Sequence, residues 1–309
     1  MKKILLVLLV STSFLLQGQQ TILSDSAFEV YGAAQKKICT LEDIVDVAKN
    51  YDVIFFGEEH NDSIGHRLEI LLLEKLTERY KDQIALSLEM FDRDVQPVMN
   101  EYLGGFLKEK TFVKDARTWS NYRDYRPMIE FCKTHQTDVI CANAAGRYSN
   151  LAGRKGQLAL QELPLESKHF FAPLPYDTAR GEYYRKLMEM SGHSTSLTDT
   201  AKHKAPAMPM GSFSLVTAQS LWDATMAYSI AEYRRKKTNK KILQVNGRFH
   251  SDERFAIVEQ LKKYNPATRV MVVSSGSDDS FGHTDWEKFR KLGDYIIITN
   301  PRIPRTFAD

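Results

Sequence analysis

The chain has 309 residues, of which 43% are apolar and 26% are charged, and its formal net charge is +3. This length and composition are typical of a globular protein with one large domain or two smaller ones. The small net charge, without a clustered basic face, argues against a nucleic-acid-binding protein.

Residues 1–18 have the pattern of a secretory signal peptide. Lys2 and Lys3 precede an apolar run over residues 4–16, and the small residue Gly18 follows. This pattern is typical of a leader that is removed on export, and the run is shorter than the roughly 20 residues that span a bilayer as a helix. We therefore expect export to the periplasm or cell surface and a mature chain of residues 19–309. Because no cysteine lies in this region, the sequence does not predict a lipoprotein.

Six short apolar runs are predicted to be buried strands, because near-continuous apolar character is typical of parallel strands covered on both faces. They cover residues 53–56, 84–88, 139–142, 241–245, 270–273 and 295–299. Helical patterns separate several of them, for example over residues 67–80 and 252–264. The alternation predicts an α/β fold with a mostly parallel sheet flanked by helices.

Two stretches interrupt this alternation of strands and helices. The first, from about residue 91 to about residue 135, contains only helical patterns. The second, from about residue 147 to about residue 235, is longer and contains several prolines. We expect both to be helical insertions in a single domain, forming a smaller helical subdomain over the strand ends.

Two predicted strands end in the same Gly-x-x-His pattern. Gly57-Glu58-Glu59-His60 follows one strand, Gly247-Arg248-Phe249-His250 follows another, and Glu89 ends a third. Ligands of open parallel sheets bind at the carboxyl ends of the strands, where converging carboxylates and imidazoles are candidate acids, bases or metal ligands. His60, His250 and one of the glutamates are candidates to hold a divalent metal. The structural alternative is that these groups cap helices and tie down turns.

A second group of residues suits haem chemistry. Arg147 and Tyr148 follow the strand at 139–142, and methionines flank His193 and His203. Tyrosine can ligate ferric haem, a neighbouring arginine can pair with haem propionates, and methionines supply an adaptable apolar wall. The simpler interpretation is that these tyrosines and methionines belong to the core.

Taken together, these motifs resemble one known family. They are Gly57-Glu58-Glu59-His60 with His66, Leu88-Glu89-Met90-Phe91-Asp92-Arg93, Ala142-Asn143-Ala144, Arg147-Tyr148, Ala218-Gln219-Ser220-Leu221-Trp222-Asp223-Ala224-Thr225-Met226-Ala227 and Gly247-Arg248-Phe249-His250. From about residue 45 to about residue 300, the chain resembles the ChaN-type haem-binding proteins. Their wider superfamily includes Tiki and TraB-like proteins and the erythromycin esterases.

The resemblance implies an exported haem-binding protein of an iron-acquisition system, without catalytic turnover. It implies haem held between two subunits by a tyrosine, best matched by Tyr148 beside Arg147. A histidine of the partner subunit would approach each iron, matched by His203 or His193, and an outer-membrane haem receptor is an implied partner.

Some members of the superfamily are hydrolases, and this keeps an enzymatic alternative open. That alternative is a metal-assisted or Glu/His-dependent hydrolase of esters or peptides. Its residues would be Glu58, Glu59, His60, Glu89 and His250.

Overall fold

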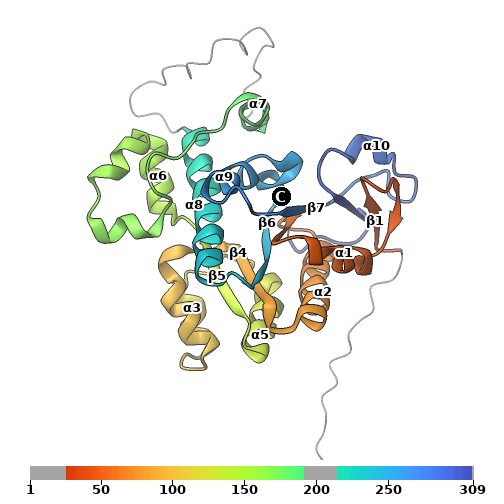
Figure 1. The fold of residues 1–309 in the computed structure, drawn as a ribbon, viewed down its shortest axis with the longest axis horizontal. Coiled ribbons are helices and arrows are strands. Elements are labelled where there is room, and N and C mark those ends of the chain that lie inside the picture. Colours follow the sequence, from red (N-terminus) through yellow and green to blue (C-terminus); the bar gives the residue numbers. More distant parts are fainter. Residues whose placement is uncertain (1–25, 191–213, 308–309) are drawn as a thin grey trace, which may run out of the picture.

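An eight-stranded sheet runs through the molecule in the computed structural model, which describes residues 26–190 and 214–307 (Figure 1). The strand order is β2-β1-β8-β7-β3-β6-β4-β5. The strands are β1 (Phe28–Gly32), β2 (Lys37–Cys39), β3 (Val53–Glu58), β4 (Ile84–Asp92), β5 (Asp138–Asn143), β6 (Lys241–Gly247), β7 (Val270–Ser277) and β8 (Tyr295–Thr299). The strands from β8 to β5 are parallel, and β1 and β2 are antiparallel additions at one edge. The predicted fold class and all six predicted strands are confirmed, whereas β1 and β2 were not predicted.

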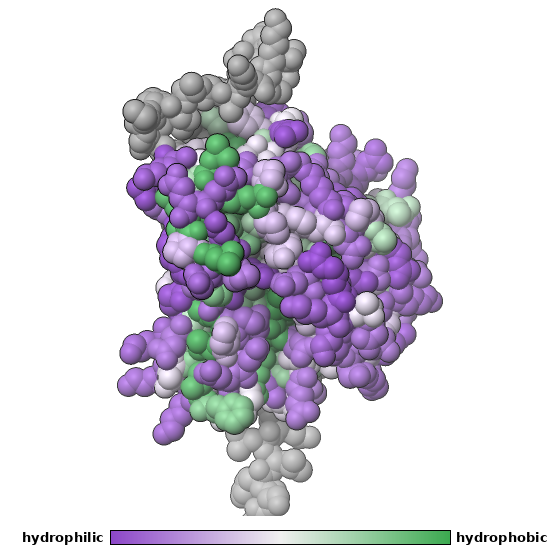
Figure 2. All heavy atoms as spheres, turned by 60° about the vertical axis from the view of Figure 1, so that its left-hand side comes forward, coloured by the Kyte–Doolittle hydropathy of each residue, from purple (hydrophilic) through white to green (hydrophobic). Residues whose placement is uncertain are grey.

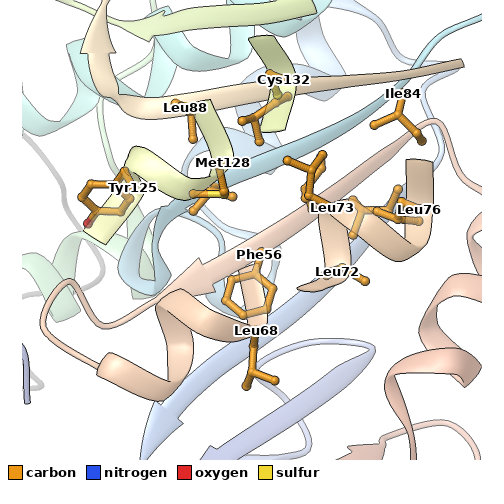
Figure 3. Packing of buried hydrophobic residues seen from close by; sticks show 14 of the residues in the cluster. Phe56, Leu68, Leu72, Leu73, Leu76, Ile84, Leu88, Tyr125, Met128 and Cys132 are labelled. Atoms are coloured by element: carbon orange, nitrogen blue, oxygen red, sulfur yellow. The ribbon is translucent and has the colours of Figure 1, made fainter. Parts of the chain in front are cut away.

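One face of the sheet is covered by α1 (Leu41–Val47), α2 (Ser63–Tyr80), α3 (Gln96–Leu103) and α5 (Tyr122–His135). Helix α2 begins after Asp62, whose side chain accepts a hydrogen bond from the Ile64 amide at 3.0 Å. Its leucines at helical spacing are fully buried against the strands, as Figure 3 shows for Leu68, Leu72, Leu73 and Leu76. This packing fixes the position of the first turns of α2 relative to the end of β3.

The opposite face is covered by α8 (Leu215–Lys236) and α9 (Ile257–Tyr264). Successive strand residues point to opposite faces, so Phe56 packs with α2 while Phe55 packs with Met226 and Ile230 of α8. The sheet is therefore buried on both sides, which explains the continuous apolar runs. Helix α9 begins five residues later than predicted, because Glu253, Arg254 and Ala256 have positive φ angles.

Both predicted insertions are helical within the described residues. The first contains α3, α4 (Glu109–Asp115) and α5, and the second contains α6 (Gly146–Lys155), α7 (Gly181–Met190) and α8. Because α8 lies directly on the sheet, that part of the second insertion belongs to a main layer of the fold. Helix α6 and the turns after it pack on α8 from outside, at the left of Figure 1. The predicted signal peptide lies outside the described residues.

The remaining elements are short. They are α10 (Trp286–Phe289) and the 3-10 turns Ala48–Asn50, Lys81–Gln83, Arg93–Val95, Gln157–Glu162, Leu165–Phe170, Arg248–His250 and Asp252–Arg254. Within the part of the chain that the structure describes, no helix is both long and apolar enough to cross a membrane.

Candidate functional site

The two Gly-x-x-His motifs lie side by side at the carboxyl ends of neighbouring strands. Strands β3 and β6 are paired in parallel, with Glu58 opposite Gly247. Each motif needs its glycine because the other motif occupies the space beside it. A Cβ on Gly247 would lie 2.7 Å from the Nε2 atom of His60, and a Cβ on Gly57 would lie 2.8 Å from the Cα atom of Arg248.

His250 is buried between two carboxylates from different elements. Its Nδ1 atom lies 2.5 Å from Oδ1 of Asp223 on α8, and its Nε2 atom lies 3.3 Å from Oε1 of Glu89 on β4. The Gly247 amide donates to Oε2 of Glu89 at 2.7 Å, and the hydroxyl of Tyr183 on α7 donates to Oδ2 of Asp223 at 2.7 Å. The strand end, two helices and the second motif therefore meet in one polar network.

The charge on His250 follows from these neighbours. Burial alone would disfavour the imidazolium, but Glu89 and Asp223 outweigh it and raise the pKa of His250 to about 10. The same imidazolium lowers the pKa of Glu89 against the effect of burial, whereas burial dominates at Asp223 and raises its pKa. The two carboxylates therefore favour the imidazolium form of His250 at neutral pH.

His60 is the accessible histidine at the rim formed by the carboxyl ends of the strands. Its side chain is 38% exposed, and its Nδ1 atom lies 2.9 Å from Oε1 of the buried Glu58. Burial lowers the pKa of His60, but Glu58 and Glu89 outweigh it and raise the pKa overall. The ring of Trp119 meets the imidazole edge-on at a centroid distance of 5.2 Å. A histidine oriented by a carboxylate, with its other nitrogen toward the rim, can exchange protons with a bound molecule.

Glu59 points away from the network that contains Glu58, His60 and His250. Its carboxylate lies 2.8 Å from Nη1 of Arg305 and 3.5 Å from Nη1 of Arg248. It thereby ties the first motif to the second motif and to the C-terminal segment. Of the predicted hydrolase residues, the structure brings Glu58, His60, Glu89 and His250 together, and it gives Glu59 a different set of partners.

Tyr148 and Arg147 lie at the start of α6, beyond the end of β5. The Tyr148 side chain is buried against Phe171, with ring centroids 5.0 Å apart. Its hydroxyl accepts a hydrogen bond from Nη2 of Arg147 at 3.0 Å, and the guanidinium lies over the ring, 4.3 Å from its centroid. Arg147 is half-exposed and also lies 2.6 Å from Asp94. The other two predicted haem residues, His193 and His203, lie outside the described residues.

Metal-binding geometry appears at a different place from the predicted one. Among the described residues, the one group of three or more His, Cys, Asp and Glu side chains whose ligand atoms all lie within 4.8 Å is Glu58, His66 and Glu69. A metal between His60 and His250 therefore stays a prediction.

Several residues of the site were given no role by sequence reasoning, although the stretch with Gln219 and Asp223 is one of the motifs of the family resemblance. Asp223 and Gln219 both contact His250 and stand four residues apart on α8, so a polar pair within an apolar helix was the available signal. Tyr183 had no comparable signal. Tyr125 of α5 donates to Oε1 of Glu58 at 2.7 Å, and nothing in its local sequence connects it to β3.

A small cavity reaches the network from the side of α7, α8 and α9. Its volume is about 170 Å³, and Tyr183, Asp223, Glu259 and Lys263 are among its lining residues. Pockets for drug-sized ligands are usually about 300–1,000 Å³. The cavity is therefore too small for haem, and a haem site has to be sought elsewhere on the molecule.

The chain is similar to known proteins in sequence pattern and in fold. A family model described as "Haem-binding uptake, Tiki superfamily, ChaN" matches residues 44–261. The structure titled "Cofacial heme binding to ChaN of Campylobacter jejuni" has a TM-score of 0.66 and 16% identity, covering 89% of this chain and 98% of that one. The type III effector HopBA1 gives a TM-score of 0.44 at 11% identity, covering 84% of this chain and 93% of that one, which is too distant to argue from. No curated protein sequence matches significantly.

Proposed function

Because the chain belongs to the ChaN family of haem-binding uptake proteins in the Tiki superfamily, we propose that it binds haem in iron acquisition. The observation that carries the proposal is the family match over residues 44–261. The same proposal has three further parts. The leader at residues 1–18 directs export, an outer-membrane receptor delivers or receives the haem, and the protein acts without catalytic turnover.

The proposed iron ligand is the phenol of Tyr148. Tyrosinate is an established ligand of ferric haem, and the Arg147 guanidinium already donates to this oxygen. Because Arg147 covers the buried phenol, its side chain has to move aside for iron to approach. An arginine displaced in this way is free to pair with a haem propionate, which is a favourable charge-assisted interaction. The donor set therefore fits haem.

The surface beyond Tyr148 also suits a porphyrin. Leu158 and Leu165, in the turns that follow α6, are 69% and 70% exposed. Figure 2, with the left side of Figure 1 turned forward, shows apolar residues gathered on this side of the molecule. A contiguous exposed apolar patch can mark a binding surface. We propose that haem covers this surface and that a second subunit covers the haem, with His203 or His193 supplied by the partner.

A hemin titration of the mature chain, residues 19–309, tests the proposal. We expect saturable binding, a high-spin spectrum of the tyrosinate type, and a change from monomer to dimer by light scattering. Weak binding without saturation would contradict haem binding. Saturable binding without a change in mass would contradict only the dimer.

Replacing Tyr148 with phenylalanine is expected to weaken hemin binding at least tenfold, about 1.4 kcal/mol, and to abolish the tyrosinate spectrum. The matched control is Tyr228→Phe, because Tyr228 also lies under an arginine, with Arg93 5.2 Å from its ring centroid. Hemin affinity should be unchanged in the control. An unchanged spectrum in Tyr148→Phe would show that another residue ligates the iron.

A second candidate function, hydrolysis of an ester or peptide, is favoured by the pairing of accessible His60 with buried Glu58. A base oriented by a carboxylate is a recurring feature of hydrolases, and the neighbouring His250 imidazolium would favour a developing negative charge. His60→Ala is expected to lower any haem-independent turnover of nitrophenyl esters or fluorogenic peptides about a hundredfold. Exposed His283 provides the control variant, His283→Ala, which should leave the turnover unchanged. Turnover that survives in His60→Ala would exclude this pair.

A further inference from the structure

A second polar cluster lies beneath the rim, between β3 and the first turns of α2. Glu58, His66 and Glu69 are at most 5% exposed, and their ligand atoms lie within 4.8 Å of one another. Glu58 ends β3, while His66 and Glu69 are three residues apart on α2 and so share one face of the helix. The haem proposal uses none of these side chains.

The cluster has more acceptors than donors. Glu58 Oε2, both carboxylate oxygens of Glu69 and the Nδ1 atom of His66 are buried and make no hydrogen bond of good geometry, although Nδ1 is in ion-pair contact with both glutamates. Such atoms are rare in native proteins, and each one calls for an unseen ion, water or proton. A single proton can satisfy one of these oxygens and leaves the others unpaired. A multivalent cation can satisfy all of them at once.

The orientation of His66 suits metal ligation. Its Nε2 atom lies 3.1 Å from the carbonyl oxygen of His60, so that Nε2–H donates to the backbone. This leaves Nδ1 toward the carboxylates, 3.1 Å from Oε2 of Glu58 and 3.5 Å from Oε2 of Glu69. Metal-bound histidines usually donate their second ring nitrogen to a carbonyl or carboxylate in this way.

The two distances from His66 Nδ1 to the carboxylates also match those between the ligands of a tetrahedral metal ion. Ligand atoms about 2.0–2.1 Å from a tetrahedral zinc ion are separated by about 3.3 Å, which lies between the two observed separations. One imidazole and two carboxylates form a donor set that zinc accepts.

We propose that Glu58, His66 and Glu69 form a buried site for one divalent cation, with Zn²⁺ as the best match. Oε1 of Glu58 accepts hydrogen bonds from the hydroxyl of Tyr125 at 2.7 Å and from Nδ1 of His60 at 2.9 Å. These two residues would therefore hold a metal-binding carboxylate in place. Through Glu58 the bound cation also fixes the orientation of His60 at the rim, so the site links the buried helix α2 to the accessible histidine.

The test is a Zn²⁺ titration of the full mature chain after treatment with EDTA and without hemin. We expect one Zn²⁺ per chain by calorimetry, and a rise in melting temperature with Zn²⁺ concentration. Glu69→Gln and His66→Gln should each lower the Zn²⁺ affinity at least a hundredfold. Tyr125→Phe, which removes only a partner of Glu58, should lower it about tenfold.

The controls separate this site from surface binding and from haem. Glu78 lies on the exposed side of the same helix, and His283 is an exposed histidine. The variants Glu78→Gln and His283→Gln should therefore bind Zn²⁺ like the parent chain. Tyr148→Phe should also bind Zn²⁺ normally. The proposal is wrong if Zn²⁺ does not raise the melting temperature of the parent chain. It is also wrong if folded Glu69→Gln binds Zn²⁺ as tightly as the parent chain does.

Discussion

Replacing Phe56 with alanine is expected to lower the free energy of unfolding by about 3–5 kcal/mol. Phe56 is fully buried in the core between β3 and α2, and Figure 3 shows its ring next to Leu68. Removing the ring loses buried apolar area and leaves a cavity that the packed leucines of α2 fill only in part. Because Phe56 directly precedes Gly57, the same contact holds the first motif against the helix that carries His66 and Glu69.

Urea denaturation of the purified chain measures this effect, and Phe106→Ala is its matched control. Phe106 is 83% exposed, so its removal should change the free energy of unfolding by less than about 0.5 kcal/mol. A loss below about 1 kcal/mol in Phe56→Ala would contradict the close packing of α2 on β3. An unchanged slope of stability against urea would show that the variant still unfolds from the same compact state.

The inner strands were predictable because their burial on both faces leaves a local pattern of apolar residues in the sequence. Strands covered on both faces are mostly apolar, so β3 and β6 are visible as nearly continuous apolar runs in the sequence. The edge strand β2 and its neighbour β1 lack this signal. Glu29 lies within β1 and Lys37 within β2, and both side chains are at least partly exposed at this end of the sheet.

The candidate site was predictable only where the backbone itself places the residues. The Gly-x-x-His motifs follow adjacent strand ends, so the convergence of His60 and His250 followed from the parallel topology. Asp223 reaches His250 from a helix, and this pairing depends on the docking of α8 on the sheet. Glu69 was not recognised because a glutamate in a helix is usually exposed, and only its burial here reveals it.

Replacing Asp223 with asparagine is expected to cost about 3 kcal/mol of unfolding free energy near neutral pH. Removing one partner of a buried ion pair typically costs about 3–5 kcal/mol, and the lower end applies because Glu89 still faces His250. Tyr183 can still donate to the asparagine oxygen, so the loss comes mainly from the charge. Asp279→Asn, at an exposed position, should have almost no effect. Urea denaturation measures both variants.

The pH dependence of this loss in unfolding free energy tests the charge on His250 more directly than its size at one pH does. The pKa of His250 is raised from 6.5 to about 10 in the folded chain, so its protonation stabilises the fold. This contribution is complete below about pH 6.5 and is lost as the pH rises through about 10. The difference between the parent chain and Asp223→Asn should therefore be largest near pH 6 and should shrink toward pH 10. The pKa of Glu89 is lowered, and its contribution is lost only in acid, below its ordinary value of 4.5. A difference that stays constant over this range would mean that His250 is neutral in the folded protein.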